Sequence, residues 1–168
     1  ALSEDLPAFM AARPDRTRST TFERVLDVIV DRERARFGAW YEMFPRSAGS
    51  DPSRSATFAE AAGMLAYVAS MGFDVLYLPP IHPIGRTFRK GRNNSLTSAP
   101  HEPGSPWAIG SEAGGHTAIE PGLGTIDDFD AFVDAATKQG LEIALDIAFQ
   151  TSPDHPYVRE HPEWFRRR

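Results

Sequence analysis

The sequence predicts an α/β fold built on a parallel sheet, because apolar strand patterns and amphipathic helix patterns alternate along it. Short apolar runs typical of strands occur at residues 37–44, 73–78 and 141–149. Helical patterns separate these runs, at about residues 57–72 and 125–140. The middle run is apolar on both faces, as expected for a covered parallel strand. This order fits an open doubly wound sheet or a closed barrel, and periodicity leaves both possible.

Both predicted helices carry boundary signals. Thr57 stands three residues before Glu60, and Thr125 three residues before Asp128, which is the spacing of a capping box. Each helix is expected to begin there, because the paired side chains satisfy free N–H groups of the first turn. The helices are expected to end at Gly72 and Gly140. The face of the second helix that is expected to be buried comprises Ile126, Phe129, Phe132, Val133 and Ala136.

The first part of the chain is typical of the end of another domain. Residues 4–12 favour a weak helix, and the β-branched residues 25–31 are typical of a short strand. A charged run at 32–36 follows, of the kind that usually forms a solvated link. We therefore assign residues 1–31 to the tail of an N-terminal domain with its linker, and residues 32–168 to the α/β domain.

Composition limits the classes of partner. The 168 residues carry a formal net charge of −5 and a pI near 5.5, which argues against nucleic-acid or anionic-membrane binding. Without an apolar run of about 18 residues or a signal-peptide pattern, a cytoplasmic protein is expected. The sequence has no cysteine and therefore no thiolate metal ligand. It begins with Ala1 and ends at Arg168 without a closing signal, which suggests a segment of a longer protein.

The loop between the second strand and the second helix is the most informative segment. Its 46 residues, 79–124, show no periodic pattern, whereas such loops usually have about 2–6 residues. Long loops at the carboxyl end of a strand are where barrel enzymes build their sites. The glycine-rich run 110–115 is a weak candidate for cradling a phosphate. A second cluster suits a phosphate or a sugar, or else a solvated loop, and comprises Arg86, Arg89, Lys90, Arg92, Asn93 and Asn94.

Polar residues also mark the end of the third strand. Asp146 lies in an apolar run, where an unpaired carboxylate is costly, so we expect it to have a partner. Gln150 suits either a substrate contact or a turn. Trp107 suits a sugar platform but more simply anchors its own loop. The segment 152–156 is typical of a turn and a helix start. No spacing typical of a metal site links the histidines, which are His82, His101, His116, His155 and His161.

Three stretches resemble the first three strand motifs of the α-amylase superfamily. They are Trp40–Ser47, Gly72–Pro83 and Leu145–Gln150. The resemblance implies a (β/α)8 barrel of the TIM type, of which roughly the first three β/α units are present after the end of an N-terminal domain. It favours the barrel over the open sheet.

In detail the chain resembles one family of that superfamily, the α-1,4-glucan:maltose-1-phosphate maltosyltransferases. Amylases carry Asn and His four and five residues after the third-strand Asp, whereas this chain has Gln150 and Thr151 there. The segments Phe88–Asn94 and Pro106–Gly110 are also similar to that family. The resemblance runs from about residue 30 to the end of the chain.

The resemblance implies transfer of a maltosyl unit from α-maltose 1-phosphate to the non-reducing end of an α-1,4-glucan, with release of phosphate. The reaction would be a retaining double displacement. The nucleophilic Asp and the acid/base Glu would lie beyond Arg168, so the segment alone is expected to be inactive. No cofactor and no metal are expected. The residues that it assigns to substrate binding are Lys90, Gln150, Asn94 and, at a position where family members vary, Ser105; Asp146 would support the site structurally.

Two other functions stay open. One is an amylase-like α-glucoside hydrolase or a trehalose-converting enzyme, which phosphate dependence would separate from a transferase. The other is a non-catalytic glucan-binding fragment. The resemblance further implies a homodimer and a place in the trehalose-to-glucan pathway. Because an incomplete barrel leaves strand edges unpaired, poor solubility is expected for the segment alone.

Overall fold

A computed structural model describes residues 5–166, and the chain divides into two units, Ala1–Arg32 and Glu33–Arg168. In the first unit, helix α1 (Asp5–Ala12) forms where the sequence predicts a weak helix, and it buries no residue. The rest of that unit has no regular helix or strand.

The short strand expected at residues 25–31 does not form. Val25, Val28, Ile29 and Val30 are all more than four-fifths exposed. A strand is stable only when a neighbour pairs with its backbone N–H and C=O groups, and no segment within residues 5–166 pairs with this stretch. The prediction from β-branched composition was therefore wrong, because composition supplies the side chains of a strand but not its partner.

The second unit begins with a short helix, α2 (Glu33–Arg36), where a solvated link was expected. The Arg34 guanidinium donates to the carbonyl of Asp74 at 3.2 Å and to that of Gly140 at 3.2 Å. It also forms an ion pair with Glu142 at 3.4 Å. The charged run thus contacts the segments that enter the second and third strands.

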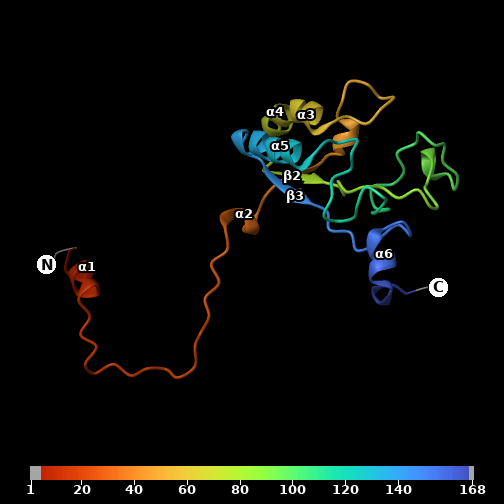
Figure 1. The fold of residues 1–168 in the computed structure, drawn as a ribbon. Helices are drawn as coiled ribbons and strands as arrows, with labels where there is room; N and C mark the ends of the chain where they lie inside the picture. The colour runs from red at the N-terminus through yellow and green to blue at the C-terminus, as the bar shows by residue number, and fades with distance from the viewer. Residues whose placement is uncertain (1–4, 167–168) are drawn as a thin grey trace. The chain divides into compact units, whose positions relative to one another are not determined.

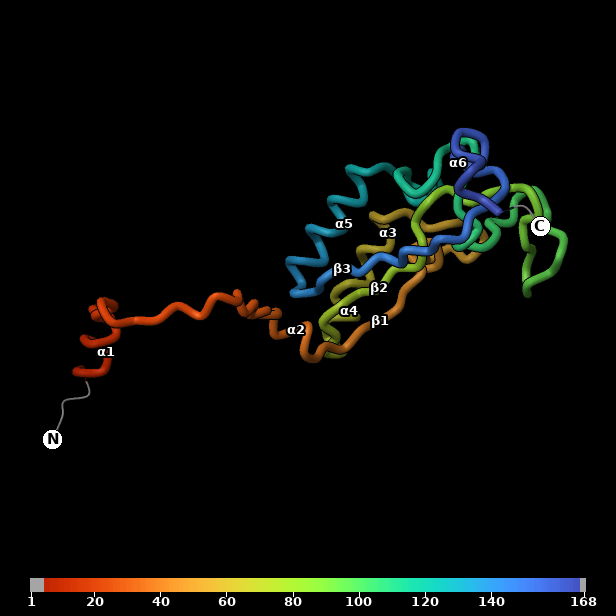
Figure 2. Tube along the Cα trace, turned by 90° about the horizontal axis from the view of Figure 1, so that it is seen from below, coloured from red at the N-terminus to blue at the C-terminus, as the bar shows by residue number. Residues whose placement is uncertain are grey.

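Three parallel strands form one sheet in the order β1 (Trp40–Glu42), β2 (Val75–Leu78), β3 (Glu142–Leu145). In the register, Tyr41 lies beside Leu76, and Leu76 lies beside Ile143. The parallel sheet predicted from the sequence is confirmed. Figures 1 and 2 show the long loop and the last helix gathered beyond the carboxyl ends of the strands.

The helices begin at the predicted residues. Capping boxes are present at Thr57 with Glu60 and at Thr125 with Asp128. The first predicted helix is divided into α3 (Phe58–Ala61) and α4 (Leu65–Ser70) by a 3₁₀ turn that contains Gly63, a residue that weakens helices through its backbone freedom. The second is a continuous α5 (Ile126–Lys138). Helix α6 (Pro156–Glu160) follows the third strand, and 3₁₀ turns occur at Pro45–Ser47, Ala62–Met64, Arg92–Asn94 and Pro162–Trp164.

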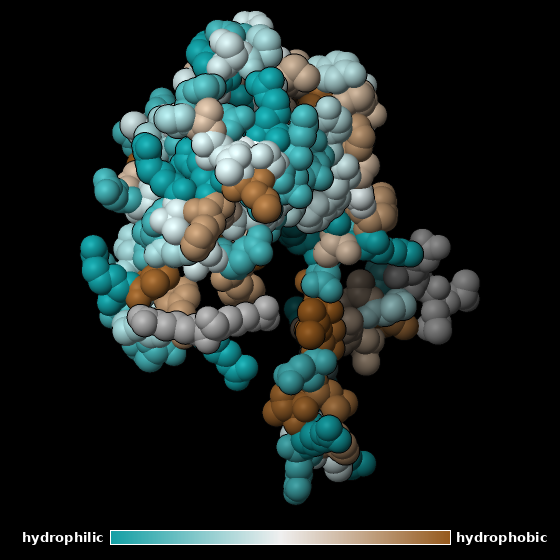
Figure 3. Space-filling model, turned by 90° about the vertical axis from the view of Figure 1, so that its right-hand side faces the viewer, coloured by the Kyte–Doolittle hydropathy of each residue, from teal (hydrophilic) through white to brown (hydrophobic). Residues whose placement is uncertain are grey.

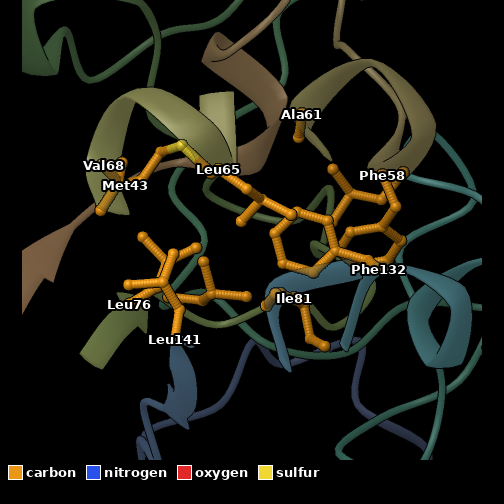
Figure 4. Close-up of a cluster of buried hydrophobic side chains, with 12 residues drawn as sticks. Met43, Phe58, Ala61, Leu65, Val68, Leu76, Ile81, Phe132 and Leu141 are labelled. Carbon is orange, nitrogen blue, oxygen red and sulfur yellow. The ribbon is translucent and has the colours of Figure 1, made fainter. Parts of the chain in front are cut away.

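The core lies between the sheet and helices α3, α4 and α5, which cover the same face of it (Figure 1). Phe58 of α3 and Phe132 of α5 pack with ring centroids 5.6 Å apart. Leu76 of β2 faces the same cluster, which Figure 4 draws in close-up. On the predicted face of α5, Ile126 is 58% exposed. It is the first residue of the helix and is not part of the hydrophobic core cluster, so its assignment to the buried face was wrong.

The third strand is shorter than the apolar run at residues 141–149 that predicts it. β3 ends at Leu145, although the N–H of Asp146 still donates to the carbonyl of Leu78 at 3.0 Å. Ile147 and Phe149, which follow β3, are 73% and 92% exposed. Within residues 5–166, β3 is an edge strand that pairs with β2 alone. Figure 3 shows a face of the molecule on which hydrophobic groups interrupt a mostly hydrophilic surface. Among the described helices, none is long and apolar enough to cross a membrane.

Replacing Phe132 by Ala should lower the free energy of unfolding by about 3–5 kcal/mol, because the ring is 2% exposed and its loss leaves a cavity. Urea unfolding at low protein concentration, followed by tryptophan fluorescence, measures the change. The control is Ile126→Ala on the same helix, which should change the free energy by no more than about 0.5 kcal/mol. Equal losses in the two variants would contradict the assigned core.

Candidate functional site

The long loop 79–124 is ordered and is joined to the segment that follows β3. Ile84 and Ile109 form an antiparallel bridge, and Ile109 also forms a parallel bridge with Thr151. Both isoleucines are buried. The N–H of Ser152 donates to the carbonyl of Ile109 at 2.7 Å. The loops that leave the second and third strands are therefore one packed unit, located at the carboxyl ends of the strands.

Arg89 belongs to the predicted cationic cluster, but its guanidinium is used inside the loop. Its Nε donates to the carbonyl of Gly85 at 2.8 Å, and its terminal nitrogens donate to the carbonyls of Ile84 at 2.8 Å and Glu102 at 2.9 Å. Each of the three guanidinium nitrogens thus donates to a carbonyl, which uses three of the five N–H donors. Arg89 is therefore a structural residue, and it fixes the start of the segment that carries Lys90.

Glu102 holds the other end of the same segment. Its carboxylate accepts from the N–H of Ala99 at 2.7 Å and from that of Arg92 at 3.2 Å. These two hydrogen bonds are the largest causes that lower the pKa of Glu102 below its ordinary value. Asn93 and Asn94 adopt left-handed backbone angles, with φ of 55° and 60°, which asparagine tolerates. Asn94 is exposed at this tip.

Lys90 is half-buried on the wall of a cavity of about 580 Å³ between the loop after β1 and the loop after β2. Within residues 5–166 no hydrogen bond or ion pair engages its ammonium group. Arg54, on the same wall, is instead paired with Glu60 and Asp51. The cavity thus presents an uncompensated lysine. Its other charged or imidazole residues are Arg46, Asp51, Arg92, His101 and Glu102.

Asp146 has a partner, as the sequence predicts, although the sequence does not say which residue it is. The indole Nε1 of Trp107 donates to its Oδ2 at 2.7 Å, and the Trp107 ring meets Phe44 edge-on at a centroid distance of 5.9 Å. Trp107 is therefore the loop anchor that was expected. Burial, and then hydrogen bonding to Asp146, raises the pKa of Tyr77. This cluster joins the tips of all three strands.

The remaining predicted binding residues are spread around these anchors. Ser105 is half-buried, and its carbonyl accepts from the N–H of Ala108 at 3.0 Å. Gln150 is exposed, directly before the bridge at Thr151. Lys90 lines the large cavity, whereas Gln150 lines neither that cavity nor a smaller one of about 90 Å³ beside it. The described residues thus hold the two side chains on one packed unit but not on one cavity wall.

The segment 152–156 forms the predicted turn and helix start. His155 Nδ1 accepts from the N–H of Tyr157 at 3.0 Å and so caps α6. Asp154 does more than the sequence suggests. Its carboxylate accepts from the N–H of Arg86 at 2.6 Å and from the N–H of Thr87 at 2.7 Å. No local signal reveals this contact, because its partners lie 67 and 68 residues away.

Three imidazoles form a polar core beneath the loops. His155 and His116 are linked, Nε2 to Nδ1, at 3.1 Å, and His116 Nε2 lies 2.7 Å from the carbonyl of Ala148. His82 Nδ1 lies 3.0 Å from the carbonyl of Ala118. Since His155 Nδ1 accepts, its Nε2 must donate to His116, whose own Nε2 then donates to Ala148. This network is complete when each imidazole is neutral.

The glycine-rich run 110–115 packs against this core. A Cβ at Gly110 would lie 2.5 Å from His155, and one at Gly115 would lie 2.2 Å from its Nε2. Glycine is required there by the close approach of His155, and that packing accounts for the run without a bound phosphate. No group of three or more metal-ligating side chains with suitable geometry occurs in the described part of the chain.

Comparison with known proteins shows which enzymes the chain is similar to. No family model matches the chain. It is 57% identical over 168 residues to the α-1,4-glucan:maltose-1-phosphate maltosyltransferase of Myxococcus xanthus. It is 58% identical to the enzymes of that name from Rhodospirillum rubrum, over 164 residues, and Mycolicibacterium smegmatis, over 169 residues. The chain is homologous to a segment of the maltosyltransferase family.

The chain spans about a quarter of the length of these maltosyltransferases: 25%, 24% and 24%, respectively. Among solved structures, it is similar to an α-amylase from Lactobacillus plantarum, with a TM-score of 0.62 and 36% identity over 78% of the chain. A maltogenic α-amylase from Thermotoga neapolitana gives 0.61 and 30% identity over 77% of the chain. The chain covers 27% of each. Because these relatives are TIM barrels, the three parallel strands are part of a (β/α)8 barrel rather than of an open sheet.

Stability of this segment should fall as the pH drops below 6.5. Burial is the largest cause that lowers the pKa of His155 and of His82 below 6.5, so the folded state favours the neutral rings. Their stabilising contribution is present above the unfolded pKa and is lost as the pH falls through the folded values. Urea midpoints measured at about pH 7.5 and 5.5 test this.

The variant His155→Gln should show a smaller loss of stability between the two pH values. His101→Gln is the matched control, because His101 is exposed in the loop, and it should retain the full loss. If the stability of the unsubstituted protein is the same at both pH values, the neutral imidazole network is not the state that the fold requires.

Proposed function

We propose that this chain is part of an enzyme that transfers a maltosyl unit from α-maltose 1-phosphate to the non-reducing end of an α-1,4-glucan and releases phosphate. The observation that carries the proposal is the identity to maltosyltransferases along nearly the whole chain. The geometric feature that supports it is Lys90, which lies on a cavity wall at the strand tips and has no hydrogen-bond or ion-pair partner among residues 5–166.

Lys90 and Gln150 are the proposed contacts to the donor. A lysine ammonium is a compact charge with three donors, which suits a phosphate that leaves with negative charge. An amide both donates and accepts, which suits a sugar hydroxyl or a phosphate oxygen. The two residues lie on loops that are bridged through Ile109 and Thr151, so they can act on one ligand once the rest of the barrel closes around them.

The other proposed site residues support this pair. Asn94 is an exposed amide four residues after Lys90 and is proposed to contact the same substrate. Ser105 lies in the same loop and is proposed to contact the substrate, at a position where family members vary. Asp146 is proposed to support the site through Trp107 rather than to attack the sugar, because its carboxylate accepts a hydrogen bond from the indole.

The chemistry is proposed to be a retaining double displacement. An Asp attacks the anomeric carbon, the bond to the phosphate oxygen breaks, and phosphate leaves. The 4-hydroxyl of the glucan then attacks the glycosyl-enzyme, with a Glu acting first as acid and then as base. Both carboxylates are assigned to strands that follow residue 168, while this segment contributes donor binding.

Several finer assignments accompany this proposal. Residues 1–31 would be the tail of an N-terminal domain and its linker, and residues 32–168 the first part of the catalytic barrel. The complete enzyme would be a cytoplasmic homodimer that uses no cofactor, and it would act in glucan synthesis from trehalose. Gel filtration with light scattering of the complete enzyme tests the homodimer.

A second candidate function is favoured by the similarity to two amylases of known structure. In that case the complete enzyme would transfer the sugar to water. Incubation with α-maltose 1-phosphate and a glucan acceptor separates the two functions. Phosphate release with glucan elongation supports the transferase, whereas shortening of a glucan in the absence of any sugar phosphate supports the hydrolase.

Replacing Lys90 by Ala in a maltosyltransferase that contains this segment should lower kcat/KM for α-maltose 1-phosphate by about 10- to 100-fold. The reason is that a hydrogen bond to a charged group contributes about 1.5–3 kcal/mol. Release of inorganic phosphate is the measurement. Lys138→Ala, in the exposed last turn of α5, is the matched control and should leave kcat/KM unchanged. Unchanged kinetics in Lys90→Ala would remove this residue from the donor site.

A further inference from the structure

The turn that carries Lys90 is held from both sides. On one side, Asp154 accepts hydrogen bonds from the N–H groups of Arg86 and Thr87, and its Oδ1 accepts from Thr87 Oγ1 at 2.5 Å. On the other side, Arg89 donates to three carbonyls of the loop. Phe88 lies between these two anchors.

Phe88 shows what the anchors accomplish. Its φ is 56°, in the left-handed region that a bulky side chain rarely adopts, and its ring is 86% exposed. An exposed ring has no packing that could hold such a conformation. The strain is therefore maintained by the hydrogen bonds on either side of it. That left-handed step sets the direction in which the chain leaves Arg89, and hence the place of Lys90.

Asp154 is itself fixed to the segment that carries Gln150. Its N–H donates to Ser152 Oγ at 3.2 Å. The N–H of Ser152 in turn donates to the carbonyl of Ile109. A Cβ on Gly85 would lie 1.8 Å from Ser152 Oγ, so the two loops are in direct contact next to Asp154. Asp154 lies four positions after Gln150 in the chain, with three residues between them.

We propose that Asp154 is a positioning residue of the donor site, which holds the turn at residues 86–90 so that Lys90 keeps a fixed place relative to Gln150. This inference rests on the proposed function. It assigns Asp154 no contact with substrate. The carboxylate acts through the backbone of Arg86 and Thr87, and its ionised form is the one that can accept every bond that the turn donates.

The charge state of Asp154 agrees with this role. Burial opposes its ionisation, but the hydrogen bonds from Thr87 and Arg86 outweigh burial and hold its pKa below the ordinary value of 3.8. The acceptor is therefore ionised throughout the neutral range. An amide at this position would keep the size of the side chain and lose one of the two accepting oxygens.

The test uses Asp154→Asn in a maltosyltransferase that contains this segment. The KM for α-maltose 1-phosphate should rise by about 10- to 100-fold, the range expected when a binding group is displaced, while the KM for the glucan acceptor stays the same. A general loss of structure would not change the KM for the donor while leaving the KM for the acceptor the same. Asp134→Asn, exposed on α5, is the control and should behave as the unsubstituted enzyme.

A double-mutant cycle with Lys90→Ala identifies the route of the effect. If Asp154 acts through Lys90, adding Asp154→Asn to Lys90→Ala should have little further effect on the donor KM. If the two substitutions raise the donor KM by factors that multiply in the double variant, the proposal is overturned. A donor KM that is unchanged in Asp154→Asn also overturns it.

Thr87→Val provides a second variant in case Asp154→Asn does not fold. It removes only the hydroxyl bond and should raise the donor KM by a smaller factor than Asp154→Asn, about threefold to tenfold. An unchanged donor KM in Thr87→Val, together with failure of Asp154→Asn to fold, counts against the proposal. If the unsubstituted enzyme releases no phosphate from α-maltose 1-phosphate, the proposed function falls and this inference with it. If that enzyme is active, an unchanged variant overturns the inference alone.

Discussion

The attachment of the loop after β2 to the segment after β3 is the constraint on which the site depends. A parallel sheet brings the carboxyl ends of its strands to one edge, but it does not by itself order a loop of 46 residues that leaves that edge. Here the bridges Ile84–Ile109 and Ile109–Thr151 order it, and the hydrogen bonds of Asp154 add a second attachment. The two loops are thereby held at fixed positions relative to one another.

Two kinds of packing support this attachment: an apolar core stabilises the sheet and its helices, and a polar network stabilises the loops. Helices α3, α4 and α5 cover one face of the sheet with an apolar core around Phe58, Phe132 and Leu76. Beyond the strand tips, a network of neutral imidazoles and close glycine contacts fills the same role for the loops. The polar core has directional bonds, so it fixes loop positions more narrowly than apolar contact would. Protonation of these imidazoles is expected to destabilise the loops, whereas the apolar core contains no group that titrates.

Several polar residues near the site are structural, and only their contacts distinguish them from binding residues. Arg89 and Lys90 are neighbours in a cationic run. The guanidinium of Arg89 donates hydrogen bonds to three carbonyls, whereas the ammonium group of Lys90 has no hydrogen-bond or ion-pair partner among residues 5–166. Likewise Asp146 and Asp154 are both carboxylates near strand tips. One accepts from an indole and the other from the backbone of a distant turn. Residue type alone gives no basis for these distinctions.

From residue 37 to residue 145 the sequence by itself determined the order of the strands and the main helices, because their hydrophobic periodicity is local. It also determined the two capping boxes and the glycines that end the helices, because these depend on residues within one turn of each other. It also carried the family resemblance and the turn at 152–156. Only the tertiary structure decided that residues 25–31 form no strand, that Ile126 is exposed, and that Asp154 holds Thr87. Partner strands, helix edges and hydrogen bonds between residues 67 positions apart are set by how the chain packs. Local patterns do not record that packing.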